Sequence, residues 1–154
     1  MRTVAELLPS IRFRFDVPYS ELTTLGCGGN APMVAYPEND IELASLLRVL
    51  FQRKISYFVI SGGSNIVGCD SEYNGIIIVL RQGSFKEISH IGDIISAGCG
   101  TKLIEVIQYG IKHGLGGMAS LAGIPGGLGG AVRMNAGARE DDIANHINKN
   151  ICRI

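Results

Sequence analysis

The stretch that most limits the fold of this chain is GLGGMASLAGIPGGLGGAV, at residues 114–132, which carries no formal charge and eight glycines. A bilayer span needs about 20 apolar residues, so length alone would allow a membrane helix here. Glycine, however, removes apolar side-chain area and lowers helix stability, and Pro125 interrupts a helix further. We therefore expect no membrane span, but a packed segment or a loop that lets another molecule approach its backbone.

Composition is that of a folded globular protein. The chain has 154 residues, of which 46% are hydrophobic and 18% charged, enough for one domain or for two small subdomains. Its 21 glycines are roughly twice the normal share and follow no repeat, so they are expected to act at particular positions.

Charge and ligand patterns disfavour several classes of partner. Fourteen basic residues balance fourteen acidic ones, without a basic run, so nucleic acid is not an expected partner. The four cysteines form no CxxC and the three histidines no HExxH, so no metal site is expected. Glu6 and Pro9 interrupt any apolar export signal, which favours a cytoplasmic protein with reduced thiols.

Hydrophobic periodicity and turn residues predict an α+β chain. The expected elements are helices at 39–53 and 101–113, buried strands at 57–60 and 75–80, and a hairpin of strands at 85–91 and 93–98. Asn39 is the expected N-cap of the first helix, Gly92 and Asp93 form the hairpin turn, and Gly114 follows the second helix.

The mixture of strand types with helices predicts two lobes that meet near residues 80–85. We expect a first lobe at 21–83 and a second at 84–154, preceded by an N-terminal segment at 1–20.

Two short glycine motifs follow predicted strands. SGGSN (61–65) could present backbone N–H groups to a pyrophosphate, although a plain glycine turn explains these five residues slightly better. AGCGTK (97–102) begins like a dinucleotide-binding fingerprint, but its third glycine would fall at Leu103. The second motif is therefore expected to be a tight strand-to-helix connection, and no P-loop motif is present.

The third motif is AGIPGGLGGAVRMNAGA (122–138), which contains the end of the uncharged stretch. Pro125 fixes a turn, after which a helix with unpaired first N–H groups is expected. Asn135 and Gly137 predict another polar turn. Small residues throughout would let a flat anionic ligand lie against the backbone, and a dinucleotide cofactor fits this pattern better than a membrane does.

Together with TTLGCGGNA (23–31), the motifs at 61–65 and 122–138 resemble the FAD-binding part of the UDP-N-acetylmuramate dehydrogenase family, also called the UDP-N-acetylenolpyruvoylglucosamine reductases, of peptidoglycan synthesis. The resemblance runs from about Leu22 to the last residue, and the motif at 122–138 is its most specific part.

The resemblance implies a two-lobed FAD-binding fold of the vanillyl-alcohol oxidase type. It also implies an oxidoreductase in which NADPH reduces a non-covalent FAD, which then passes hydride to the enolpyruvyl group of a UDP-sugar. Carried over by motif, the cofactor-binding residues would be Ser61, Gly62, Gly63, Ser64, Asn65, Gly123, Ile124, Pro125, Gly129, Gly130, Asn135, Ala136, Gly137 and Ala138.

The chain also departs from the family pattern. The substrate domain that carries the family's catalytic residues has no counterpart in this sequence, so no catalytic residue is assigned and the truncated chain alone is expected to lack activity. Surface that the missing domain would cover is expected to favour self-association. After the NAGA turn, Arg139, Glu140 and Asp141 replace the usual aromatic residue and glycines, so local geometry is expected to differ there.

Two alternatives stay open on the sequence. One is a stand-alone, non-catalytic flavin- or nucleotide-binding module. The other is an NAD-binding Rossmann domain, which the incomplete motif at 97–102 disfavours.

Overall fold

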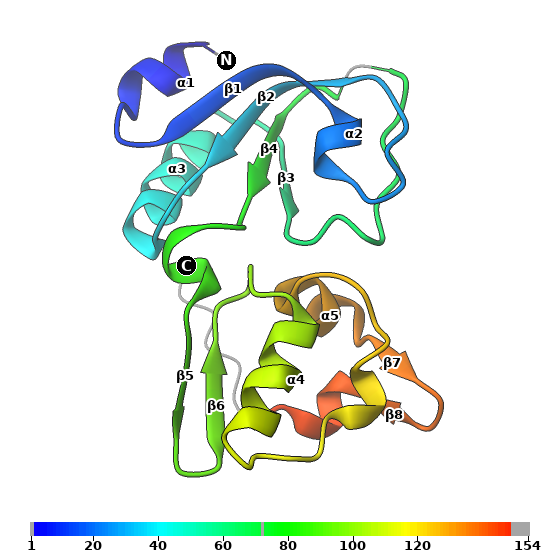
Figure 1. Ribbon diagram of the computed structural model, residues 1–154. Helices are drawn as coiled ribbons and strands as arrows, with labels where there is room; N and C mark the ends of the chain where they lie inside the picture. The colour runs from blue at the N-terminus through cyan, green and yellow to red at the C-terminus, as the bar shows by residue number, and fades with distance from the viewer. Residues whose placement is uncertain (1, 72, 149–154) are drawn as a thin grey trace.

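The computed structural model describes residues 2–71 and 73–148. Figure 1 shows two groups of elements, one containing β1–β4 with α1–α3, the other β5–β8 with α4 and α5. The chain passes from the first group to the second after β4, through a short 3₁₀ helix, Gly83–Lys86. The mixed strands and helices confirm the predicted α+β class.

The first group is built on a four-stranded sheet in the order β1-β2-β4-β3. Its strands are β1 (Arg12–Pro18), β2 (Asn30–Tyr36), β3 (Tyr57–Ile60) and β4 (Ile76–Val79). β1 pairs antiparallel with β2, whereas β2, β4 and β3 are parallel. The segment 1–20, which the sequence analysis placed outside the first lobe, thus supplies α1 (Arg2–Leu7) and an edge strand of its sheet.

Burial separates the central strand from the edge strand. All four residues of β4 are buried, as predicted. The expectation of burial is wrong for β3, because Tyr57, Phe58 and Val59 are 43–48% exposed and only Ile60 is buried. An edge strand has a neighbour on one side only, and a short apolar run does not reveal whether its strand lies at the edge.

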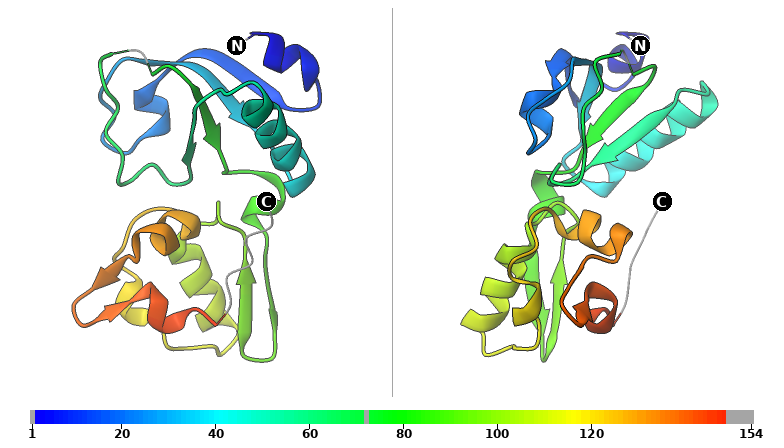
Figure 2. Two further views of the ribbon diagram at one scale, coloured as in Figure 1. Left: turned by 180° about the vertical axis from the view of Figure 1, so that it is seen from behind. Right: turned by 90° about the vertical axis from the view of Figure 1, so that its right-hand side faces the viewer.

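α3 (Asp40–Gln52) covers one face of this sheet (Figure 2). The Asn39 side chain accepts a hydrogen bond from the Glu42 amide at 2.9 Å, which confirms the predicted N-cap. Leu46 and Leu50 are fully buried against residues of β2 and β4. On the other face, α2 (Tyr19–Leu22) contributes Tyr19 and Leu22 to a second cluster.

The second group contains the predicted hairpin and helix. β5 (Ile88–Ile91) and β6 (Ile94–Ala97) pair antiparallel around Gly92, whose φ is +56°. The hairpin is shorter than predicted because the 3₁₀ helix takes residues 83–86. α4 (Leu103–Lys112) ends before Gly114, whose φ of +72° is the left-handed conformation expected after a helix.

The uncharged stretch folds as loops, a 3₁₀ helix at Ala119–Leu121 and the first part of α5 (Leu128–Met134). Two-residue strands β7 (Gly137–Ala138) and β8 (Asp141–Asp142) follow, and then a 3₁₀ helix at Ile143–His146. No helix in the described ranges is long and apolar enough to cross a membrane.

The packing of α3 predicts a large loss of stability for one of two adjacent substitutions and almost none for the other. Leu50→Ala should lower the free energy of unfolding by about 2–5 kcal/mol, since it leaves a cavity in the first core. Phe51→Ala should change it by less than about 0.5 kcal/mol, because that side chain is 85% exposed. Urea denaturation followed by circular dichroism measures both, and equal losses would contradict the packing described here.

Candidate functional site

The loop after β3 lies against the turn that precedes α5. Ser64 Oγ donates a hydrogen bond to the Pro125 carbonyl at 3.1 Å, and Ser61 Oγ donates to the Cys99 carbonyl at 2.9 Å. A Cβ on Gly62 would lie only 2.5 Å from the Gly127 amide nitrogen. The motifs at 61–65 and 122–138, far apart in sequence, therefore meet where the two groups of elements adjoin (Figure 1).

The TTLGCGGNA motif (23–31) also contacts the loop 61–65, through Gly63. Its φ is +72°, and a Cβ there would lie 2.2 Å from the Leu22 carbonyl oxygen. The Thr24 amide donates to the Gly63 carbonyl at 2.9 Å. Only glycine allows the loop to rest this closely on the segment that begins the TTLGCGGNA motif.

The backbone N–H groups of residues 62–65 find no acceptor among the residues that the structure describes. In the described part of the chain, no hydrogen bond is donated by the amides of Gly62, Gly63, Ser64 or Asn65. Successive free amides in a glycine turn form a concave anion-binding site, the chemistry that a pyrophosphate requires. The residues present thus fit the phosphate part of a dinucleotide.

The start of α5 differs from the prediction. Its first N–H groups were expected to be unpaired, but Leu128 donates to the Thr101 carbonyl at 2.7 Å and Gly129 to the Cys99 carbonyl at 2.8 Å. The prediction was wrong for these two amides because residues 99–101, within the AGCGTK connection, pack against the helix start. That segment serves as a structural bridge between the two motifs.

Other predicted residues lie apart from this contact. A Cβ on Gly123 or on Gly130 would meet no atom within 4 Å, and both residues are exposed. Asn135 ends α5 in the left-handed conformation, and its Oδ1 accepts from the Ala144 amide at 3.2 Å. Gly137 and Ala138 pair with β8, so the segment 135–138 is held by the residues that follow it.

Arg81 is a residue that the sequence analysis missed, and Thr101 of the AGCGTK motif was given no role beyond the start of a helix. Arg81 donates from Nε to the Ser61 carbonyl and from Nη2 to the Leu22 carbonyl, the latter at 2.5 Å. Burial lowers the pKa of its guanidinium from the ordinary value. Thr101 is fully buried, and its hydroxyl has no hydrogen-bond partner in the described part of the chain. The position of Arg81, just after the predicted strand 75–80, is a signal that could have found it, because ligands bind at the carboxyl ends of parallel strands.

Asp141, in the segment that departs from the family pattern, is a centre of hydrogen bonds. It accepts from Ser120 Oγ, from His146 Nε2 at 2.8 Å and from Asn145 Nδ2 at 3.3 Å. The hydrogen bonds from Ser120 and His146 lower the pKa of the Asp141 carboxyl to about 2. These bonds tie β8 to the 3₁₀ helices on either side of it.

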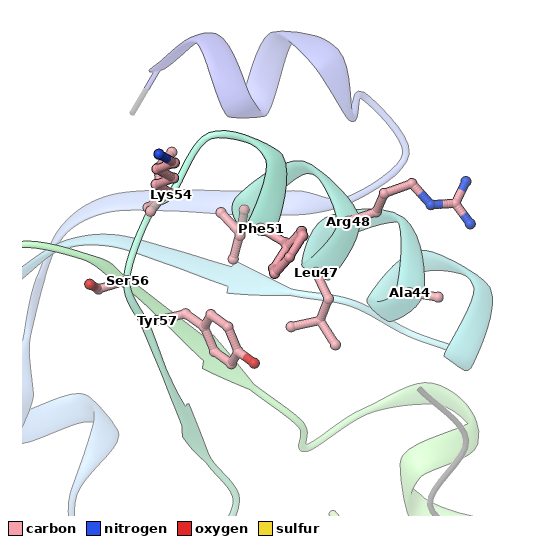
Figure 3. A pocket seen from close by; sticks show the side chains of 9 residues that line it. Ala44, Leu47, Arg48, Phe51, Lys54, Ser56 and Tyr57 are labelled. Atoms are coloured by element: carbon pink, nitrogen blue, oxygen red, sulfur yellow. The ribbon is translucent and has the colours of Figure 1, made fainter.

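A groove of about 680 Å³ lies elsewhere, between α3 and the start of β3 (Figure 3). Leu47, Phe51 and Tyr57 give it an apolar wall, and Arg48 and Lys54 lie at its border. It shares no residue with the glycine loops, so it is not the predicted cofactor site.

A mixed α+β fold whose glycine loops meet between two groups of elements, with free amides, is typical of proteins that bind a nucleotide cofactor. The model of the family described as "FAD binding domain" matches residues 31–154. The chain belongs to the FAD binding domain family.

Similar proteins carry a more specific name. The chain is 40% identical over 124 residues to a UDP-N-acetylenolpyruvoylglucosamine reductase of Pelobacter propionicus, a match covering 80% of this chain and 41% of that protein. For the same enzyme of Caldicellulosiruptor bescii, identity is 38% over 86% of this chain and 42% of the relative. The crystal structure of UDP-N-acetylenolpyruvylglucosamine reductase from Thermus caldophilus superposes with a TM-score of 0.67 at 30% identity, covering 87% of this chain and 45% of that one. The chain thus spans less than half the length of these relatives.

The contact between the loops predicts different effects for two glycines. Gly62→Ala should lower the free energy of unfolding by about 1–3 kcal/mol, because the added methyl overlaps backbone atoms. Gly130→Ala, which adds a methyl in open space on α5, should raise it by up to about 1 kcal/mol. Urea denaturation of the flavin-free protein measures both effects. A neutral Gly62→Ala variant would refute the close approach of the two loops.

The Asp141 cluster predicts an acid-sensitive contribution to stability. A carboxyl whose pKa is lowered by folding, from about 3.9 to about 2, stabilises the fold above pH 4, and this contribution is lost as the pH falls through 2. The free energy of unfolding of the wild type should therefore fall more steeply between pH 4 and 2 than that of Asp141→Asn. Glu140→Gln, next to it on the exposed turn, is the matched control and should keep the wild-type slope. Identical slopes for all three proteins would show that the cluster is not formed.

Proposed function

We propose that this chain is the FAD-binding portion of a UDP-N-acetylenolpyruvoylglucosamine reductase, an FAD-dependent oxidoreductase of peptidoglycan synthesis. The observation that carries the proposal is the row of amides at 62–65, which donate no hydrogen bond to any described residue and lie against the turn 125–127 in a chain of the FAD binding domain family. The named relatives support the reductase assignment.

The proposed cofactor site follows the motifs. Residues 61–65 would bind the pyrophosphate through backbone N–H groups, while Gly123, Ile124, Pro125, Gly129 and Gly130 would line the cofactor from the second lobe. The segment 135–138 would lie near it. We also propose that the two groups of elements are the two lobes of a vanillyl-alcohol oxidase type fold, divided near residue 83.

In the proposed reaction, each part of the chain has a limited task. Bound FAD would supply the hydride chemistry, with NADPH as the reductant and a UDP-sugar enolpyruvate as the substrate. The glycines would let the cofactor approach the backbone, and the amides would hold its phosphates without a lysine or arginine on the loop itself. Groups that stabilise the carbanion and donate its proton are proposed to lie in the part of the relatives that this chain does not match.

Two further expectations belong to this proposal. A cytoplasmic location accords with Cys27, Cys69 and Cys99, which are reduced cysteines. Self-association stays a prediction, for which the exposed Phe51 and the exposed face of β3 offer apolar surface.

The first test is an absorbance spectrum of the purified 154-residue chain, with the released chromophore identified by mass. We expect one FAD per chain and no oxidation of NADPH on addition of the UDP-sugar enolpyruvate, because the catalytic groups are proposed to lie in the part of the relatives that this chain does not match. A colourless protein that fails to take up added FAD would refute the proposal. If the chain binds FAD but adding a catalytic segment does not restore turnover of the UDP-sugar enolpyruvate, the result would favour the non-catalytic flavin module.

A charge substitution tests the location of the site. Asn65→Asp places a carboxylate beside the proposed pyrophosphate and should weaken FAD binding by about tenfold or more. Asn74→Asp, at the opposite end of the parallel strands, is the matched control and should bind FAD like the wild type. Fluorescence titration measures both affinities, and equal affinities would place the pyrophosphate elsewhere.

A further inference from the structure

We propose that Arg81 is the cation that neutralises and positions the pyrophosphate of the dinucleotide bound in the loop 61–65. This inference rests on the proposed function and adds to it a charged group that lies outside the glycine motifs. Three properties of Arg81 support it: its position, its lack of a counter-ion and its closeness to Gly63.

The position of Arg81 places its side chain next to the loop 61–65. It follows Leu80, just beyond the carboxyl end of β4, and β4 pairs in parallel with β3, whose own carboxyl end begins the loop. Its Nε donates to the Ser61 carbonyl and its Nη2 to the Leu22 carbonyl. One guanidinium therefore holds the start of the loop against Leu22, the residue that precedes the TTLGCGGNA motif (23–31).

Arg81 lacks a counter-ion among the residues that the structure describes. The two ion pairs found there are Arg14 with Glu21 and Asp141 with His146. The side chain is half-buried, and burial lowers its pKa, yet a guanidinium keeps its charge at neutral pH. A partly desolvated charge without an opposite charge is unfavourable, so the arrangement is best explained by an anion that arrives with a ligand.

The loop lies close to this charge. A Cβ on Gly63 would be 2.8 Å from Arg81 Nη2, so a side chain at this position would push the guanidinium away. The free amides of residues 62–65 belong to the same loop, and the remaining N–H donors of Arg81 have no partner in the described part of the chain. A row of amide dipoles next to a fixed cation fits a diphosphate better than a single carboxylate.

The experiment compares ligands with and without phosphate. We expect Arg81→Met to weaken FAD binding by about tenfold to a hundredfold, the loss typical of a charge-assisted hydrogen bond. Binding of riboflavin, which has no phosphate, should change by less than about threefold. Arg12→Met is the matched control, because Arg12 donates to Gln82, the neighbour of Arg81, but lies exposed over the Tyr36 ring. It should leave both affinities unchanged.

Arg81→Lys and the salt dependence of FAD binding distinguish an electrostatic role of Arg81 from a purely structural one. Lysine keeps the charge but cannot hold both carbonyls, so Arg81→Lys should bind FAD with intermediate affinity and keep the wild-type salt dependence, whereas Arg81→Met should show a weaker dependence. Equal losses for FAD and riboflavin, or an unchanged salt dependence in Arg81→Met, would show that Arg81 only supports the loop and would overturn the inference. If Arg81→Met does not fold, Arg81→Lys decides: equal losses of affinity for FAD and riboflavin overturn the inference, and a loss confined to FAD supports it.

Inorganic pyrophosphate distinguishes this inference from the proposed function. A wild-type chain that binds pyrophosphate through Arg81 but takes up no FAD would refute the flavin assignment and support the anion site. A wild-type chain that binds FAD with an affinity that Arg81→Met leaves unchanged would support the flavin assignment and refute the role of Arg81. Isothermal titration calorimetry gives both affinities.

Discussion

The arrangement of this molecule depends on a contact between backbones, in which Gly62 lies against Gly126 and Gly127. The buried residues of the two groups form separate hydrophobic clusters, one pair around the first sheet and one between α4 and α5, although the partly buried Phe85 and Cys99 pack against the first. Their apolar cores therefore do not by themselves fix how the groups adjoin. Glycines let the two loops approach to distances that a Cβ would forbid, and two serine hydroxyls then bond to carbonyls across the contact.

The same contact explains the second glycine motif. Residues 99–101 accept bonds from Ser61 on one side and from the start of α5 on the other. The connection between β6 and α4 thus lies between the two loops and holds both. Its G-x-G resembles a nucleotide fingerprint because a tight turn and a close backbone approach need glycine for the same steric reason, with or without a ligand.

Local signals were enough to predict several elements. The Asn39 cap, the Gly92 turn and the left-handed Gly114 each act within a few residues, and the structure contains all three. Features that depend on distant parts of the chain were missed. β1 was not recognised, the exposure of β3 follows from its edge position, and the amides of α5 are occupied by a segment almost thirty residues earlier. The cofactor residues stay predictions, although the loops that contain Ser61 and Pro125 do meet.

Electrostatics at the candidate site also depend on the fold rather than on composition. Fourteen basic and fourteen acidic residues give a net charge of zero, and the sequence has no basic run that would mark an anion site. Folding nevertheless places the Arg81 guanidinium next to the loop 61–65; among the described residues, this guanidinium has no counter-ion and the amides of residues 62–65 donate no hydrogen bond. A potential built from backbone dipoles and a single half-buried cation needs no cluster of surface lysines. An anion site of this kind would bind the pyrophosphate of a cofactor tightly while the protein keeps a net charge of zero.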